Sequence, residues 1–258
     1  MCSSEVIVKT TKKSMLIAVV IICLTPLSQA TDNEIYMASL DWPPYTGEDL
    51  PNQGHVIKHA KKVFAAMGYT LKVDFFPWAR AVKMGLDPKS KYLGYLPEYF
   101  DQSLTEKCAF SDSIGFSPLG FAQRKDNPIE WQNLNDIAQL KSVGVVRGYV
   151  NSPGLDARIA SGNINADEAV SDAENIKKLS RMRVPIIVID EQVFEYWLSH
   201  DEELMAVKDS VEMHPNLLDK KSLYLCFKKN EEGLAFKDIF NAGLNKQGMK
   251  RFMQESFR

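Results

Sequence analysis

The chain has 258 residues, of which 45% are hydrophobic and 25% charged, a composition that excludes intrinsic disorder and leaves enough apolar residues for one large or two small cores. Its formal net charge of −2 gives no electrostatic reason to expect nucleic acid or an anionic membrane as partner. The four His are scattered and no CxxC occurs, so the sequence predicts neither a bound metal nor a cofactor.

Residues 1–30 have the pattern of an export signal. Three lysines precede the ten-residue apolar run Met15–Leu24, and the small residues Ser28 and Ala30 suit cleavage after Ala30. A membrane anchor is the competing interpretation, but this run is too short for about 30 Å of hydrocarbon. We therefore expect a signal peptide at 1–30 and a soluble, exported mature protein.

Two cysteines remain after such cleavage, because Cys2 and Cys23 belong to the signal. Cys108 and Cys226 then lie in an oxidising compartment, where they either form one disulfide or stay as two buried free thiols.

The first elements after the signal alternate between strand and helix. Residues 35–40 form a predicted strand, and an apolar stripe beginning at Val56 predicts a helix that Gly68 ends. Residues 70–76 alternate as a strand, and Pro77 opens a second helix. This order is typical of an α/β unit with parallel strands.

A second unit of the same kind follows residue 118. Helices are predicted over 133–140, from Ser152, from a capping Asp172 and over 191–198, with strands at 142–146, 168–170 and 184–190. A last strand at 222–227 precedes a helical tail whose apolar positions extend to Phe252 and Met253.

The loop after the first strand places Trp42 and Tyr45 around a double proline. Their large apolar faces and polar tips are suited to stacking on a ligand, or they fold back onto the core. Ligands of open α/β sheets bind beyond the carboxyl ends of strands, and this position favours the binding interpretation.

Five stretches then carry a resemblance to a known family. In chain order they read WPPYTGEDLPNQGHVIKHAKKVFAAMGYTLKVDFFPWARA, FSDSIGFSPLGFAQRK, SVGVVRGY, ENIKKLSRMRVPIIVID and LYLCFKKNEEG. Their order and spacing resemble those of the family-3 bacterial extracellular solute-binding proteins, periplasmic receptors for polar amino acids and related solutes that often serve ABC importers. The resemblance covers nearly the whole mature chain.

The resemblance implies an α/β fold of the type II periplasmic-binding-protein class, in which each of two lobes is a mostly parallel sheet flanked by helices and two crossovers form the hinge. It places lobe 1 at residues 31–115 and 221–258 and lobe 2 at 116–220. It implies a monomeric, non-enzymatic periplasmic protein that binds a small polar solute, without a cofactor, and passes it to an ABC permease. A sensory protein serving a membrane receptor and a lyase-type enzyme on the same scaffold, with Glu98 or Asp190 as acid or base, are the alternatives.

The resemblance also assigns candidate ligand contacts. Trp42 or Tyr45 matches the aromatic residue that stacks on the ligand, and Asp190 matches an acid that accepts hydrogen bonds from an amino group, although it is equally placed to cap the next helix. A helix N-terminus offers free N–H groups to an anion, and Gly148 permits a close backbone approach. The further candidates are Trp78, Arg80, Arg147, Gly148 and Tyr149.

One departure concerns the carboxylate of an amino-acid ligand. Relatives that bind amino acids carry an Arg about six residues before the segment that begins here at Phe110, and Leu104 stands at that offset. Arg80 or Arg147 is the candidate replacement for this bidentate contact, although Arg80 is as well suited to the surface. Tyr95, Pro97, Glu98 and Tyr99 suggest an aromatic-rich pocket for a cationic or cyclic solute, although the tyrosines are equally suited to packing in the core.

Overall fold

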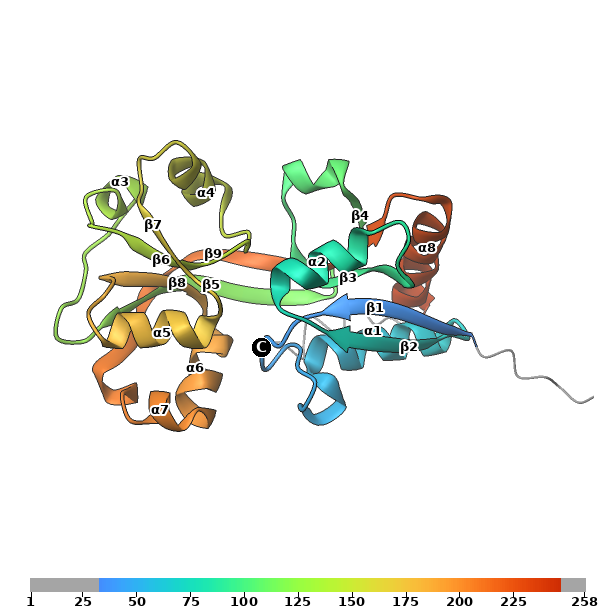
Figure 1. The fold of residues 1–258 in the computed structure, drawn as a ribbon, viewed down its shortest axis with the longest axis horizontal. Helices are drawn as coiled ribbons and strands as arrows, with labels where there is room; N and C mark the ends of the chain where they lie inside the picture. Colours follow the sequence, from blue (N-terminus) through green and yellow to red (C-terminus); the bar gives the residue numbers. More distant parts are fainter. Residues whose placement is uncertain (1–32, 247–258) are drawn as a thin grey trace, which may run out of the picture. The chain divides into compact units, whose positions relative to one another are not determined.

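The predicted alternation of strands and helices is present in the computed structural model, which describes residues 33–246 (Figure 1). The predicted signal peptide at 1–30 and the tail positions Phe252 and Met253 lie outside these residues. The described residues belong to one compact unit. Among them, no helix is long and apolar enough to cross a membrane.

The first elements follow the predicted order. They are β1 (Glu34–Ser39), η1 (Pro51–Gln53), α1 (His55–Ala66), β2 (Thr70–Phe75), α2 (Trp78–Leu86) and β3 (Tyr92–Tyr99). The apolar stripe of α1, including Val56 and Phe64, is buried. Gly68 has a φ of 87°, the left-handed conformation in which glycine carries no steric penalty, so the chain can turn there after α1.

The middle of the chain builds a second set of elements. They are η2 (Gln102–Glu106), β4 (Cys108–Phe110), β5 (Gly115–Arg124), α3 (Leu134–Ile137), β6 (Val143–Val146), α4 (Pro153–Ala160), β7 (Ala166–Ala169), α5 (Asp172–Ser180), β8 (Ile186–Asp190), α6 (Glu191–His200), α7 (Glu202–Met205) and η3 (Lys208–Ser210). The chain then enters the long strand β9 (Val211–Lys228) and the helix α8 (Glu231–Lys246).

The described strands form one nine-stranded sheet in the order β2-β1-β3-β9-β5-β8-β6-β7, with β4 paired to β9. The outer strands are parallel at both ends, because β1 pairs in parallel with β2 and β3, and β6 pairs in parallel with β7 and β8. The central strands β9 and β5 run antiparallel to each other and to β3 and β8. This arrangement confirms the predicted α/β class.

The two central strands coincide with the predicted crossovers. The boundary between residues 115 and 116 falls at the start of β5, and the one between 220 and 221 falls inside β9. Each boundary therefore lies in a continuous strand and not in a linker. The division into lobes at these residues stays a prediction.

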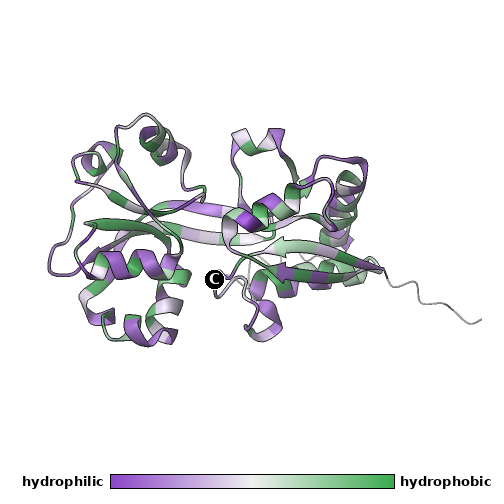
Figure 2. Cartoon of the chain, in the orientation of Figure 1, coloured by the Kyte–Doolittle hydropathy of each residue, from purple (hydrophilic) through white to green (hydrophobic). Residues whose placement is uncertain are grey.

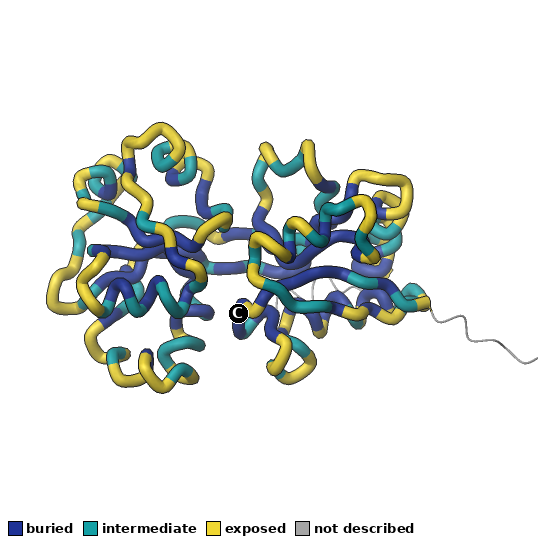
Figure 3. The backbone as a smooth tube through the Cα atoms, viewed as in Figure 1, coloured by how far each residue is buried: buried dark blue, intermediate teal, exposed yellow. Residues whose placement is uncertain are grey.

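The core follows the strands. Every residue of β3, β6 and β8 is buried, and Figure 3 shows buried residues along the strands and exposed ones on loops and on the outer turns of helices. Figure 2 shows the strand β8 as hydrophobic, in keeping with its sequence Ile-Ile-Val-Ile before Asp190. Strands covered on both faces read as continuous apolar runs.

Four parts of the sheet were not expected from the sequence: β3, β4, β5 and the first half of β9. β3 contains Gly94 and Pro97, and β5 contains Gly115, Pro118 and Gly120. Glycine and proline normally argue against a strand interior, so local pattern hides the strands at the centre of the sheet.

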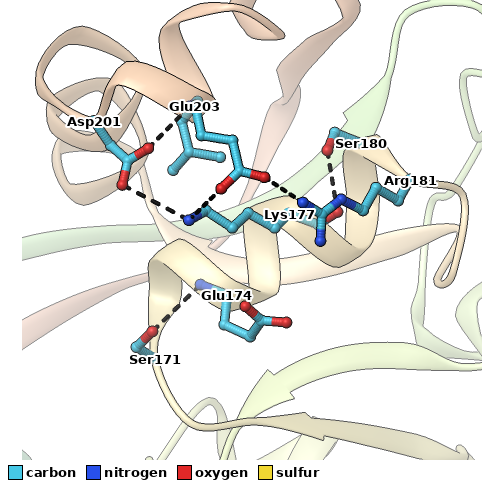
Figure 4. Close-up of polar contacts among 8 residues, drawn as sticks. Ser171, Glu174, Lys177, Ser180, Arg181, Asp201 and Glu203 are labelled. Carbon is cyan, nitrogen blue, oxygen red and sulfur yellow. Dashed lines mark hydrogen bonds and ion pairs between the residues drawn. The ribbon is translucent and has the colours of Figure 1, made fainter.

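The N-terminal cap of helix α5 differs from the prediction. Ser171, and not Asp172, caps it, because the Ser171 hydroxyl accepts a hydrogen bond from the Glu174 amide. The same helix is joined to α7 by ion pairs: Lys177 Nζ lies 2.8 Å from a Glu203 carboxylate oxygen, and Arg181 contacts the other oxygen (Figure 4).

The cysteine pair is resolved as a disulfide. Cys108 on β4 and Cys226 on β9 are bonded, with their Cα atoms 5.5 Å apart, and they close a sequence separation of 118 residues. Of the two alternatives that the sequence left open, the structure has the bonded one.

Candidate ligand-binding site

A small cavity lies where several parallel strands end. Its walls come from the loop after β1, the start of α2, the end of β3, the loop after β6, and β9. This is the edge at which open α/β sheets bind their ligands. The lining residues are Leu40, Trp42, Trp78, Pro97, Glu98, Tyr99, Tyr149, Val150 and Leu223.

Four of these residues were candidate ligand contacts from the sequence, namely Trp42, Trp78, Glu98 and Tyr149. Pro97 and Tyr99 were named with the expected aromatic pocket, and both line the cavity. The other three, Leu40, Val150 and Leu223, were not expected, because aliphatic wall residues resemble ordinary core residues in sequence.

Trp42 and Tyr45 have different positions in the site. Trp42 lines the cavity, and Tyr45 stacks behind it with ring centroids 4.4 Å apart. The turn between them is closed by the Trp42 carbonyl, which accepts hydrogen bonds from the amides of Tyr45 and Thr46. The turn at the double proline thus places Trp42 in the cavity wall, with the ring of Tyr45 packed against it.

Trp78 connects the two ends of the sheet. Its indole Nε1 donates a hydrogen bond of 2.9 Å to the carbonyl of Gly148, and its ring meets those of Tyr95 and Tyr149 edge to face. Gly148 has a φ of 79°, which favours glycine. The predicted residues Trp78, Tyr95, Gly148 and Tyr149 therefore form one contact group.

Glu98 is the acidic residue of the cavity wall. It is 5% exposed, accepts a hydrogen bond from the Tyr95 hydroxyl at 3.0 Å through one oxygen, and accepts the Tyr99 amide through the other. Burial raises the pKa of Glu98 to about 8, because removal from water disfavours the charged form more than these donors favour it.

Asp190 lies behind Tyr45 and does not line the cavity. One carboxylate oxygen accepts the Val193 amide and so caps α6; the other accepts the hydroxyls of Tyr45, at 3.0 Å, and Ser117. Burial raises its pKa to about 6. The capping interpretation describes this geometry, and the contact with ligand stays a prediction.

A third buried carboxyl belongs to Asp172, which was not a candidate. Asp172 is 5% exposed and accepts a hydrogen bond of 3.3 Å from the hydroxyl of Tyr149, a wall residue. Burial raises its pKa to about 7. The sequence offered a cap residue at this position and no signal of a site.

The two candidate arginines do not line the cavity. Arg80 is exposed, and its guanidinium lies 5.0 Å from the ring of Phe76. Arg147 is also exposed, and its Nε lies 2.7 Å from a carboxylate oxygen of Glu168. The replacement of a carboxylate-binding Arg by either of them stays a prediction, and Leu104 lies on η2.

Some backbone donors at the start of α4 are already paired within the chain. The Ser152 hydroxyl accepts the Leu155 amide, and the Asp156 carboxylate accepts the backbone and side-chain amides of Asn151. Binding of an anion at this helix start stays a prediction.

These contacts define what the site can do. Aromatic faces and one buried carboxyl surround a cavity of about 30 Å³, room for about two water molecules. Within residues 33–246, no cluster of His, Cys, Asp and Glu is arranged to hold a metal ion. The arrangement is suited to holding a small group by stacking and hydrogen bonds.

No family model matches the sequence, and no curated protein matches it. Solved structures do share its fold. A histidine kinase sensor domain with similarity to periplasmic binding proteins aligns with a TM-score of 0.72 and 14% identity, covering 87% of this chain and 95% of that one.

Two ancestral proteins align in the same way. An ancestral arginine-binding protein bound to arginine has a TM-score of 0.67 and 14% identity, with 87% of this chain and 98% of that chain covered. The ancestral amino acid-binding protein AncCDT-1, described as a precursor of cyclohexadienyl dehydratase, has a TM-score of 0.64 and 15% identity, with 87% and 95% covered. The fold implied by the sequence resemblance is confirmed.

Proposed function

We propose that the chain is an exported solute-binding protein of the family-3 type, which captures a small polar solute between two lobes and delivers it to a membrane transporter. The observation that carries the proposal is the cavity at the carboxyl ends of β1, β3 and β6, whose walls come from both ends of the sheet. Residues from both ends can hold one solute only when they meet, so binding energy shifts the protein toward that form.

The test is capture of a solute by the purified exported protein. Native mass spectrometry of fresh protein should detect a retained small molecule, and titration calorimetry against amino acids, amines and small organic acids should find a ligand with a Kd well below about 1 mM. An unliganded protein that binds no member of this panel would contradict the proposal.

A matched pair of variants tests the location. Trp78→Ala should weaken binding of the captured solute at least ten-fold, because a stacking wall is lost. Trp197→Ala removes another half-buried tryptophan, on α6 and outside the cavity, and should leave the Kd unchanged. Equal effects of the two variants would place the solute elsewhere.

A sensory role is the second candidate, favoured by the similarity to a histidine kinase sensor domain. Deletion of the gene separates the two roles. Loss of uptake of the labelled solute supports delivery to a permease, whereas unchanged uptake with a lost cellular response to the solute supports a membrane receptor as partner.

The proposed protein is not an enzyme, although one similar structure is described as a precursor of a dehydratase. Glu98 is the wall residue able to exchange a proton. Because the proposed role is binding without chemistry, we expect the captured solute to be unchanged after prolonged incubation with the protein. Product formation that Glu98→Gln abolishes would replace this part of the proposal by a lyase function.

A further inference from the structure

We propose that the solute is a small organic cation without a carboxylate, such as a diamine or an alkylguanidine; this inference rests on the proposed function. The cavity walls supply the first reason. Trp42, Trp78, Tyr99 and Tyr149 contribute aromatic rings, whose faces attract ammonium and guanidinium groups. The acidic residue among them is Glu98.

The second reason is a missing positive charge. Glu98, Asp172 and Asp190 are each at least 95% buried, and none of them forms an ion pair with a described residue. Buried carboxyls without a cationic partner must either keep a proton or meet a positive charge. A cation entering the cavity would supply that charge next to Glu98.

The third reason is that the wall offers no place for an anion. The described residues that line the cavity include no Lys or Arg, and Arg80 and Arg147 lie outside it. A ligand carboxylate in this cavity would therefore have no Lys or Arg of the wall as a partner, and removing an unpaired charge from water is costly. An amino acid carries such a carboxylate, whereas its decarboxylated amine does not.

Lys221 is a buried cation near the cavity wall. Its side chain is 8% exposed, and its Nζ lies 5.3 Å from the ring centroid of Tyr99. The same Nζ lies 3.7 Å from the Asp219 carboxylate, and Lys221 is not among the lining residues. Its ammonium group thus already has Asp219 and the ring of Tyr99 as neighbours.

The experiment compares ligands that differ only in the carboxylate. Calorimetric titration of the exported protein with agmatine and arginine, and with cadaverine and lysine, should give at least ten-fold tighter binding for the carboxylate-free member of one pair. Tighter binding of arginine or lysine would overturn the inference, and so would binding of an anionic solute or of none of these four probes.

A variant of Glu98 tests whether the preference for the amine comes from the cavity wall. Glu98→Gln should weaken binding of the preferred amine at least ten-fold and narrow the difference within its pair, while Trp197→Ala should preserve both values. An unchanged preference in a folded Glu98→Gln protein would overturn the inference. The solute retained in native mass spectrometry separates the two proposals: a retained amino acid or anion defeats the cation class alone, and no captured solute at all defeats the proposed function as well.

Discussion

At the scale of single residues, Glu98 links the site to the stability of the fold. Its pKa in the folded protein is raised to about 8 from the 4.5 of a free carboxyl, so the folded state binds the proton more tightly than the unfolded state. This contribution to stability is full below about pH 4.5 and is lost as the pH rises through about 8. The raised pKa values of Asp172 and Asp190 also stabilise the folded protein at low pH. Their contributions are lost as the pH rises through about 7 for Asp172 and about 6 for Asp190.

The ligand-free protein should therefore lose unfolding free energy between pH 5 and 8, by on the order of 3 kcal/mol from Glu98. Urea denaturation at pH 5, 6.5 and 8 measures this loss, and Glu98→Gln should reduce it. Glu203→Gln is the control, because Glu203 is an exposed carboxylate whose pKa is lowered by its hydrogen bond to Lys177. Equal slopes for wild type and Glu98→Gln would contradict the assignment.

Binding of a cation should in turn release protons. The groups that act on Glu98 are Tyr95, the Tyr99 amide, Asp101 and Lys221, and a ligand cation would add a positive charge that lowers the pKa of Glu98. The affinity should then rise with pH up to about 8. Calorimetry at pH 7 in buffers of different ionisation enthalpy counts the released protons, and a buffer-independent enthalpy would show that Glu98 does not titrate on binding.

Residue types in the site were predictable to different degrees. Trp42 and Tyr149 could be found because each closely follows a recognisable strand, and large aromatics at strand ends are costly without a purpose. Leu40, Val150 and Leu223 could not be found, because aliphatic side chains serve core and cavity wall alike. Arg80 and Arg147 are exposed and contact Phe76 and Glu168, and the partner of Arg147 lies 21 residues away on the next strand, a separation that local pattern does not reveal.

At the scale of elements, the disulfide ties β4 to β9, and β9 also pairs with β3 and β5. The bond closes a separation of 118 residues, so it removes much conformational freedom from the unfolded chain. Replacing both Cys108 and Cys226 by Ser should lower the unfolding free energy by about 2–5 kcal/mol.

Denaturation with and without a reductant tests this expectation and contains its own control. The reductant should destabilise wild type by a similar amount and leave the double variant unaffected. Wild-type stability that does not respond to complete reduction would contradict a stabilising role of the bond between β4 and β9.

Some of these elements could be predicted from the sequence, and others could not. Helix α1 and strand β2 were recognisable from the period of their apolar residues, and β6 and β8 from short continuous apolar runs. Strands β3 and β5 were hidden by Gly94, Pro97, Pro118 and Gly120. At Gly94, an added Cβ would lie 2.0 Å from the Cys226 carbonyl oxygen. The close approach of β9 therefore requires glycine at a position where local pattern argues against a strand.

At the scale of the whole molecule, the contacts across the sheet oppose entry of a solute. Tyr45 is hydrogen-bonded to Asp190 and Trp78 to Gly148, and the neighbouring cavity has a volume of about 30 Å³. A solute of amino-acid size does not fit a space for about two waters. The proposed function therefore requires these contacts to separate and reform, with β5 and β9 as the strands that connect the two ends of the sheet.

Tyr45→Phe tests this cycle, because it keeps the ring that supports Trp42 and removes the hydroxyl bonded to Asp190. The variant should populate the separated form more, so that its apparent Kd rises about two- to five-fold in proportion to the lost fraction of the binding-competent form.

Small-angle X-ray scattering should give a larger radius of gyration for ligand-free Tyr45→Phe than for wild type, and equal values at saturation with the tightest-binding solute of the panel. Tyr196→Phe, which removes a hydroxyl on α6 outside the cavity, should match wild type in both measurements. If saturation changes the scattering of none of the three proteins, the solute reaches the cavity without separation of these contacts, and the hinge role of β5 and β9 is refuted.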